Sequence, residues 1–393
     1  MRLALLCDDA SVGPWLDALA NDESHELVMA ATLNDAAAEL LRGRSGIRLT
    51  SHWEDLVGAN RFDAVLVGGS DAPTLEAIKQ LATSGQSLLF LPSAQQGSTF
   101  IYELSLIRDD NRVAICPAVW HRCDPALCRL RASIRDASIG QVQLVQLQRE
   151  LVQTGTSSTV AQQQVDAAML LDFDLLRWLI GDFDQVTALR TGATETGVLT
   201  QSVKLAGRGL PEATWDVRAG KQPQFRATIH TDRGVTLLER DAVTLEWNVT
   251  DPAGVRDEGN RRQAVLDFLR NFGTAGNPPI EWGELVKAFE TIDATHRSVR
   301  RRRTIELHFE PMSERAIFKT QMTAIGCSVL IATFLLVLLY LAIASAMPFL
   351  PRTVLLVLRT LIFAPLGLFL VLQLLYPLTR PSETEGNGSG PHA

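Results

Sequence analysis

The chain has 393 residues, which is long enough for two domains and a sizeable core. Its 44 acidic residues against 37 lysines and arginines give a formal net charge of −7, which argues against general nucleic-acid binding. The five cysteines show no zinc-ribbon spacing, and so few in a long chain are typical of a reducing compartment. The opening apolar run is too short for a secretory signal peptide, so we interpret it as a first strand.

Residues 1–117 alternate between short apolar runs and helical patterns. Continuous apolar runs separated by crossover helices are typical of buried parallel strands. The runs lie at 3–6, 27–31, 64–67, 88–91 and 113–116, and the helical patterns at 15–20, 34–42, 53–57 and 73–83. We therefore predict an α/β domain with a Rossmann-like, doubly wound parallel sheet, in which ligands bind beyond the carboxyl ends of the strands.

Residues 118–310 carry a different pattern, in which several strand-like segments follow one another without intervening helices. This pattern predicts an α+β domain with an open, largely antiparallel sheet. Helices are expected at 125–136, 162–180, 260–272 and 282–299. Strands are expected at 142–152, 186–190, 200–204, 213–217, 224–230, 235–240, 243–249 and 304–309.

Four local segments resemble the Gfo/Idh/MocA family, which includes glucose–fructose oxidoreductase and inositol dehydrogenase. They are DAVLVGGSDAPTLEAIKQLATSG at 63–85, WHRCDP at 120–125, DLLRWLIGDFDQVTAL at 174–189, and the closing helices with AVLDFLRNF, PPIEW and FETIDATHRS at 264–298. Their order and spacing extend the resemblance over roughly residues 1–310. It implies a nicotinamide-dependent dehydrogenase fold and a homodimer paired through the sheet of the second domain.

The glycines that would hold the cofactor are missing where the resemblance places them. The three positions of the dinucleotide fingerprint fall on Cys7, Asp9 and Val12, although Gly13 could serve a shifted turn. Side chains there obstruct the approach of a pyrophosphate, and carboxylates oppose its charge, although a helix N-terminus favours an anion. We therefore expect a degenerate site with no cofactor, or NAD or NADP if the chain is an active enzyme.

The positions that the resemblance assigns to catalysis also carry unsuitable residues. The family lysine falls on Leu91 or Pro92, depending on a one-residue shift, and the family histidine falls on Leu171. A second histidine position falls on Thr74. None of these side chains has the acid–base chemistry that hydride transfer to or from a hydroxyl requires. The sequence thus offers no catalytic residue, and together these losses favour loss of the usual hydride chemistry.

Three residues remain as candidates for a substrate pocket: His121, Arg122 and Asp172. The resemblance places a pocket-lining arginine at Arg122, and a solvated or salt-bridged arginine is the alternative. On the helix that carries Asp172, Asp174 and Arg177 stand three residues apart, which predicts a structural ion pair.

A metal site is not expected. His121 lies close in sequence to two cysteines, Cys123 and Cys128, but their spacing is not that of a tetrahedral zinc site. We interpret them as part of a mixed helix start.

The C-terminal part of the chain carries the strongest physical signal. Residues 320–347 contain no charged residue and are long enough to cross ~30 Å of hydrocarbon as a helix. A turn at 348–351 leads to a second apolar span at 354–378. We predict a linker at 311–319, a transmembrane helical hairpin at 320–378 and a disordered polar tail at 379–393.

The charges that flank the hairpin predict its orientation. Four arginines at 300–303, with Arg315 and Lys319, precede the first span, and Arg380 follows the second. Only Arg352 and Arg359 lie on the connecting side. The positive-inside rule then places both termini and the soluble domains in the cytoplasm, at the inner membrane of a bacterium. The arginine run either contacts anionic headgroups or forms a solvated face of the domain.

Two functions fit these observations. The first is a membrane-anchored, catalytically degenerate binding or scaffolding module, with the lipid bilayer and an unidentified protein as partners and no nucleic acid. The second is an NAD(P)-dependent oxidoreductase with a rearranged active site, acting on a sugar or polyol-like substrate. Saturable binding of the dinucleotide would distinguish them.

Overall fold

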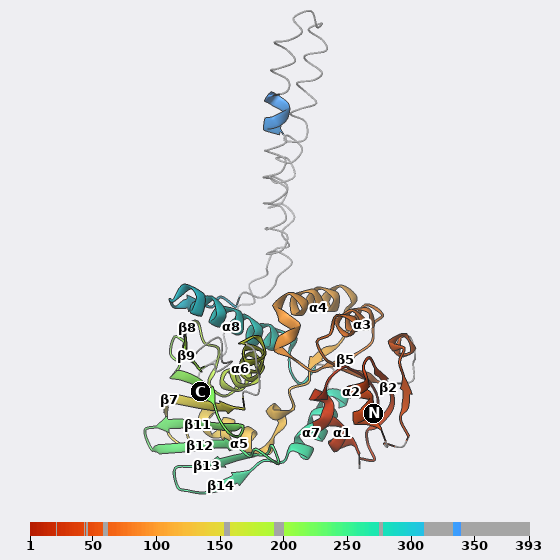
Figure 1. The fold of residues 1–393 in the computed structure, drawn as a ribbon. Coiled ribbons are helices and arrows are strands. Elements are labelled where there is room, and N and C mark those ends of the chain that lie inside the picture. The colour runs from red at the N-terminus through yellow and green to blue at the C-terminus, as the bar shows by residue number, and fades with distance from the viewer. Residues whose placement is uncertain are drawn as a thin grey trace, which may run out of the picture. The chain divides into compact units, whose positions relative to one another are not determined.

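The computed structural model describes residues 1–20, 22–42, 44, 46–57, 62–152, 158–191, 200–274, 278–309 and 333–338 (Figure 1). Residues 1–309 form one compact unit. Residues 333–338 are helical, whereas the rest of the expected linker, hairpin and tail lies outside the described residues. Within the described part of the chain, no helix combines the length and apolarity that a membrane crossing requires.

The first sheet consists of six parallel strands in the order β3-β2-β1-β4-β5-β6. Their bounds are β1 (Arg2–Cys7), β2 (Glu26–Thr32), β3 (Arg48–Thr50), β4 (Ala64–Gly68), β5 (Leu88–Phe90) and β6 (Ile115–Pro117). Both faces of the sheet are covered, which explains the continuous apolar runs. The order reverses between β1 and β4, and this reversal marks the expected ligand crevice. The predicted Rossmann-like sheet is confirmed.

Helices cover the two faces of this sheet, with α3 and α4 on one side and α1 and α7 on the other (Figure 1). The helices of this region are α1 (Gly13–Leu19), α2 (Asp35–Leu41), α3 (Ala72–Thr83) and α4 (Gly97–Asn111). Short 3-10 turns lie at η1 (Ala10–Val12), η2 (Trp53–Leu56), η3 (Ala94–Gln96) and η4 (Trp120–Cys123). The sequence patterns missed α4 and β3 altogether.

The second sheet has nine strands in the order β14-β13-β12-β11-β7-β10-β9-β8-β15. Its strands are β7 (Val142–Leu151), β8 (Gln185–Thr191), β9 (Thr200–Ala206), β10 (Glu212–Ala219), β11 (Gln224–Thr231), β12 (Gly234–Arg240), β13 (Trp247–Thr250), β14 (Arg256–Glu258) and β15 (Ile305–Glu306). Only β7 and β10 pair in parallel, so the predicted, largely antiparallel sheet is confirmed.

One predicted strand begins later than expected. The pattern at 243–249 predicts a strand from Val243, but β13 starts at Trp247. The reason is a turn in which Asp241 Oδ1 accepts hydrogen bonds from the amides of Val243 and Thr244, at 2.8 and 2.7 Å. An aspartate that binds amides two and three residues ahead favours a turn over continued strand pairing.

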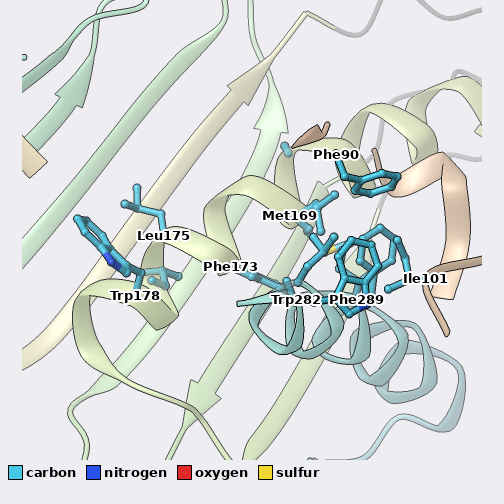
Figure 2. Close-up of a cluster of buried hydrophobic side chains, with 14 of the residues drawn as sticks. Phe90, Ile101, Met169, Phe173, Leu175, Trp178, Trp282 and Phe289 are labelled. Carbon is cyan, nitrogen blue, oxygen red and sulfur yellow. The ribbon is translucent and has the colours of Figure 1, made fainter. Parts of the chain in front are cut away.

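Three helices accompany the second sheet: α5 (Pro125–Arg135), α6 (Ser158–Ile180) and α8 (Trp282–Arg301), while α7 (Arg261–Thr274) follows that sheet in the chain. A cluster of buried side chains joins α6 and α8 to the first sheet (Figure 2). Within it, Phe90 of β5 packs edge-on against Trp282 of α8, with ring centroids 5.3 Å apart. Phe173 of α6 packs edge-on against Trp215 of β10 at 5.6 Å. One hydrophobic core therefore runs from the first sheet to the second.

Helix α7 packs in the first half of the molecule, although it follows the second sheet in the chain (Figure 1). Its Phe268 meets Trp15 of α1 edge-on, with ring centroids 5.4 Å apart. Val265 and Leu269 belong to the same buried cluster as Leu3 of β1. A late segment of the chain thus completes the core around the first strand.

Candidate functional site

The turn after β1 is closed by the carboxylate of Asp8. This side chain accepts hydrogen bonds from the amides of Ser70 and Asp71 at 3.1 and 2.9 Å. Both amides lie at the start of α3, a position that attracts anions because the amides and the helix dipole point toward it. Gly69 has φ +118°, and a Cβ there would lie 2.1 Å from Asp8 Oδ1. The chain therefore places its own carboxylate at this anion position.

The remaining fingerprint positions serve the local fold. Cys7 is fully buried at the end of β1, and Val12 is fully buried at the end of η1. Asp9 caps η1 by accepting a hydrogen bond from the amide of Ser11 at 2.8 Å. Gly13 has φ −47°, and a Cβ on it would meet nothing within 4 Å, so its surroundings do not require a glycine.

The turn after β2 is tied to the turn after β1. Asn34 donates from Nδ2 to the carbonyl of Asp8 at 2.5 Å and caps α2 by accepting from the amide of Ala37 at 2.8 Å. Its side chain is therefore engaged within the protein at the place where the fold commonly contacts a cofactor ribose.

The two candidate lysine positions lie at the end of β5. Leu91 is buried and lies so close to β4 that a Cβ on Gly68 would approach its Cδ1 to 2.9 Å. Pro92 follows it on the wall of a cavity. Thr74 is buried in α3, and its hydroxyl finds no hydrogen-bond partner among the described residues. Leu171, the histidine position, is 37 % exposed and lines the same cavity.

This cavity, which we call the switch-point cavity, has a volume of about 220 Å³ and lies beside the loop that follows β5. The other walls come from α1, η4, α6 and the strands β7, β12 and β13. The lining side chains are Ser11, Pro14, Trp15, Leu91, Pro92, Ala118, Val119, Trp120, His121, Arg149, Leu171, Asp172, Leu175, Arg240 and Trp247. Two of the three candidate pocket residues, His121 and Asp172, therefore lie on its wall, and their role in binding stays a prediction.

Asp172 is held by two partners. Arg149 of β7 donates to it with Nε and Nη2, at 3.1 and 2.7 Å, and the indole of Trp215 donates at 2.9 Å. Asp172 is 2 % exposed. A bidentate arginine and a third donor satisfy the carboxylate, so Arg149 and Asp172 form a neutral pair in the cavity wall.

Asp174 lies at the centre of a second buried cluster. Arg122 donates to it from Nε at 3.0 Å and from Nη2 at 2.5 Å, and His121 Nε2 lies 3.2 Å from its Oδ2. Burial works to raise the pKa of Asp174, but the hydrogen bond from His121 and the charge of Arg122 hold it well below its usual range. This arginine thus serves as the ion-pair partner of Asp174.

The predicted ion pair between Asp174 and Arg177 is wrong. Arg177 donates from Nη2 to Asp182 at 2.6 Å and to Glu284 at 3.3 Å. The spacing of three residues makes such a pair possible on a helix. Here Asp174 faces η4 and bonds its arginine there, so tertiary contacts override the local pairing.

Arg122 itself lines a larger crevice of about 740 Å³. Cys123, Cys128 and Arg177 share this wall. Within the described ranges, histidine, cysteine and carboxylate side chains form no group of three or more placed to hold a metal ion.

Sequence reasoning missed two arginines of the switch-point cavity, Arg149 and Arg240. They lie on β7 and β12, about ninety residues apart in sequence, and neither stands in a motif. A period-two pattern assigns strand residues to faces, but it does not show which strand ends meet at a cavity. No single-sequence signal would have found them.

Several solved structures share this fold. A putative myo-inositol dehydrogenase from Sinorhizobium meliloti matches 78 % of this chain and 100 % of its own, with 19 % identity and a TM-score of 0.65. A putative NADPH-dependent oxidoreductase from Desulfitobacterium hafniense matches 78 % and 97 %, with 14 % identity and a TM-score of 0.66. An oxidoreductase from Agrobacterium radiobacter, in complex with NAD⁺, L-tartaric acid and magnesium, matches 78 % and 98 %, with 13 % identity and a TM-score of 0.63.

The chain has the fold of Gfo/Idh/MocA-type oxidoreductases. The resemblance derived from the sequence is therefore confirmed for the fold. No protein-family model and no curated protein sequence matches the chain significantly. At these sequence identities the similarity to solved structures establishes the fold alone, and any activity depends on the residues of the site.

Proposed function

We propose that the chain is a membrane-anchored binding module, with the Gfo/Idh/MocA-type fold and without the usual dinucleotide site. The observation that carries this proposal is the position of Asp8. Its carboxylate accepts hydrogen bonds from the amides of Ser70 and Asp71, and Gly69, which has no side chain, allows the carboxylate to approach the backbone closely. A pyrophosphate at this turn would meet a carboxylate where it needs donors.

The size of the cavity and the residues at the catalytic positions support the same proposal. At about 220 Å³, the switch-point cavity is smaller than the roughly 300–1,000 Å³ typical of ligand pockets, and a dinucleotide needs far more room. Leu91, Pro92 and Leu171 stand where the resemblance places acid–base residues, and none of them transfers a proton. The site retains binding features without the groups for hydride chemistry.

Cofactor titration tests this proposal on the full-length protein in detergent. We expect no saturable binding of NAD(H) or NADP(H) up to millimolar concentration, followed by calorimetry, because Asp8 and Asp9 repel the pyrophosphate. An intact unfolding transition in the same sample is the control for a folded protein. Micromolar binding would favour the alternative, an NAD(P)-dependent oxidoreductase acting on a sugar or polyol, which the similar structures described above support.

The membrane anchor is the second part of the proposal. Residues 320–347 and 354–378 supply two apolar spans, and the arginines and Lys319 before them favour a cytoplasmic start. A fluorescent reporter that matures only in the cytoplasm should be active when fused after Ala393. A second reporter, which is active only in the periplasm, should be active when fused after residue 350, between the two spans. Periplasmic activity after Ala393 would refute the two-span arrangement.

A further inference from the structure

We propose that the switch-point cavity binds a small organic acid, whose carboxylate is held by Arg240 and whose flat apolar body lies among tryptophans. The inference rests on the proposed function in one respect, that the protein acts as a binding module. It adds the chemical class of the ligand and the residue that selects it.

Arg240 is a cation that has no carboxylate partner in the part of the chain that the structure describes. It ends β12 and lies over two indole rings, 5.8 Å from the centroid of Trp120 and 5.3 Å from that of Trp247. Its Nε donates to the carbonyl of Leu245 at 3.1 Å, and no carboxylate of the described residues forms an ion pair with it. Taking a charged group out of water without a counter-ion is unfavourable, so this arrangement favours an anionic ligand.

The neighbouring carboxylates already have partners, so among the described residues none forms an ion pair with this cation. Arg149 and Asp172 neutralise each other, and Asp174 is shared by His121 and Arg122. Burial, with the nearby charges of Arg149 and Arg261, lowers the pKa of Arg240 to about 10 against the opposing charge of Asp172, which still leaves the guanidinium charged at neutral pH. The cavity therefore retains one positive charge for a ligand to meet.

Much of the remaining wall is apolar and aromatic. Trp15, Trp120 and Trp247 line it together with Leu171 and other aliphatic side chains. A ligand with a flat apolar body would pack on such rings.

The volume limits the ligand to a small molecule. About 220 Å³ lies below the roughly 300–1,000 Å³ of cavities that hold drug-sized ligands. A single-ring or short aliphatic acid fits this limit. Arg240 can meet its carboxylate with two parallel donors, the geometry that arginine forms best with such groups.

Benzoate is the probe that tests this class. The full-length protein in detergent is titrated with benzoate, with its neutral analogue benzamide and with inorganic phosphate, and tryptophan fluorescence and calorimetry follow binding. We expect saturable binding of benzoate, at least tenfold tighter than that of benzamide or phosphate. Equal affinity for benzamide would show that the charge of the ligand does not contribute to binding. Equal affinity for phosphate would show that the apolar ring of benzoate does not contribute. Absence of benzoate binding at tens of millimolar would overturn the proposal as a whole.

Two substitutions separate a binding role of Arg240 from a structural one. Arg240→Met should weaken benzoate binding at least tenfold and leave the melting temperature equal or higher, since an uncompensated charge is removed. Arg240→Lys keeps the charge and should retain part of the affinity for benzoate. This variant tests the role of the charge if Arg240→Met fails to fold. Arg226→Met is the control, because Arg226 lies on the adjacent β11, is 47 % exposed and pairs with Glu239 on the surface. A lower melting temperature of Arg240→Met with unchanged benzoate affinity would assign Arg240 a structural role.

The benzoate titration and the cofactor titration test the two proposals separately. Binding of NAD(H) together with selective binding of benzoate would remove the proposed loss of the dinucleotide site and leave this inference standing. Binding of neither ligand would remove this inference and leave the other intact.

Discussion

Replacing Asp174 with asparagine is expected to lower the free energy of unfolding by about 3–5 kcal/mol at pH 7. Asp174 is 4 % exposed and accepts two hydrogen bonds from Arg122, with His121 at 3.2 Å. Without its carboxylate, Arg122 keeps only Glu284, at 3.4 Å, as an acidic partner. A buried guanidinium that loses its main counter-ion accounts for the large loss. Urea unfolding of the protein in detergent measures it.

The effect should depend on pH in one direction. The pKa of Asp174 lies below its usual range in the folded protein, so the unfolded chain binds the proton more readily. The stabilisation is therefore complete above an ordinary aspartate pKa of about 4 and is lost as the pH falls further through the folded pKa. The difference between wild type and Asp174→Asn should shrink over that acid range. Asp109→Asn, at an exposed residue of α4, is the control and should change little. A difference that stays constant with pH would contradict this assignment.

Replacing Phe90 with alanine should cost about 3–5 kcal/mol, the range for a large aromatic side chain removed from a core. Phe90 is fully buried in β5, edge-on to Trp282 of α8 and stacked with Phe100 of α4, at centroid distances of 5.3 and 6.2 Å (Figure 2). The substitution leaves a cavity where the first sheet meets the helices of the second, so the contacts on both sides weaken.

Denaturant unfolding followed by circular dichroism measures this loss. Leu106→Ala on α4 is the matched control, because Leu106 is 45 % exposed and its truncation removes little buried surface. A loss below about 1 kcal/mol for Phe90→Ala would mean that the core closes around the missing ring, which contradicts a tightly packed joint.

Much of the fold follows from hydrophobic patterns. The strands β1 and β4 are buried on both faces and therefore appear as unbroken apolar runs, whereas β9 alternates between buried and exposed side chains. Helix α4 escaped prediction because its buried side chains include Ser105, which satisfies its hydroxyl on the carbonyl of Ile101 at 2.9 Å. A polar residue with a local partner interrupts the apolar stripe without interrupting the helix.

The site is less accessible to sequence reasoning, because its contacts join distant segments. The sequence predicts that the carboxylates after β1 oppose a phosphate. It does not predict that Asp8 accepts a hydrogen bond from the amide of Ser70, 62 residues away. Arg240 lies over the rings of Trp120, which precedes it by more than a hundred residues, and of Trp247, which follows in the next strand. Such contacts depend on how the two sheets pack together, and the spacing of residues along the chain does not predict them.

The return of α7 to α1 has a consequence for the synthesis of this protein. Trp15 packs against Phe268, so this part of the hydrophobic face of α1 stays uncovered until the ribosome has made α7. Roughly 250 residues separate the two helices, and at about 5–20 residues per second the wait is on the order of 10–50 s. During that interval the nascent N-terminal segment presents apolar surface of the kind that chaperones bind. Because α1 is completed by a helix made so much later, we expect the N-terminal segment to be more prone to aggregation during synthesis than a domain completed by its own strands and helices.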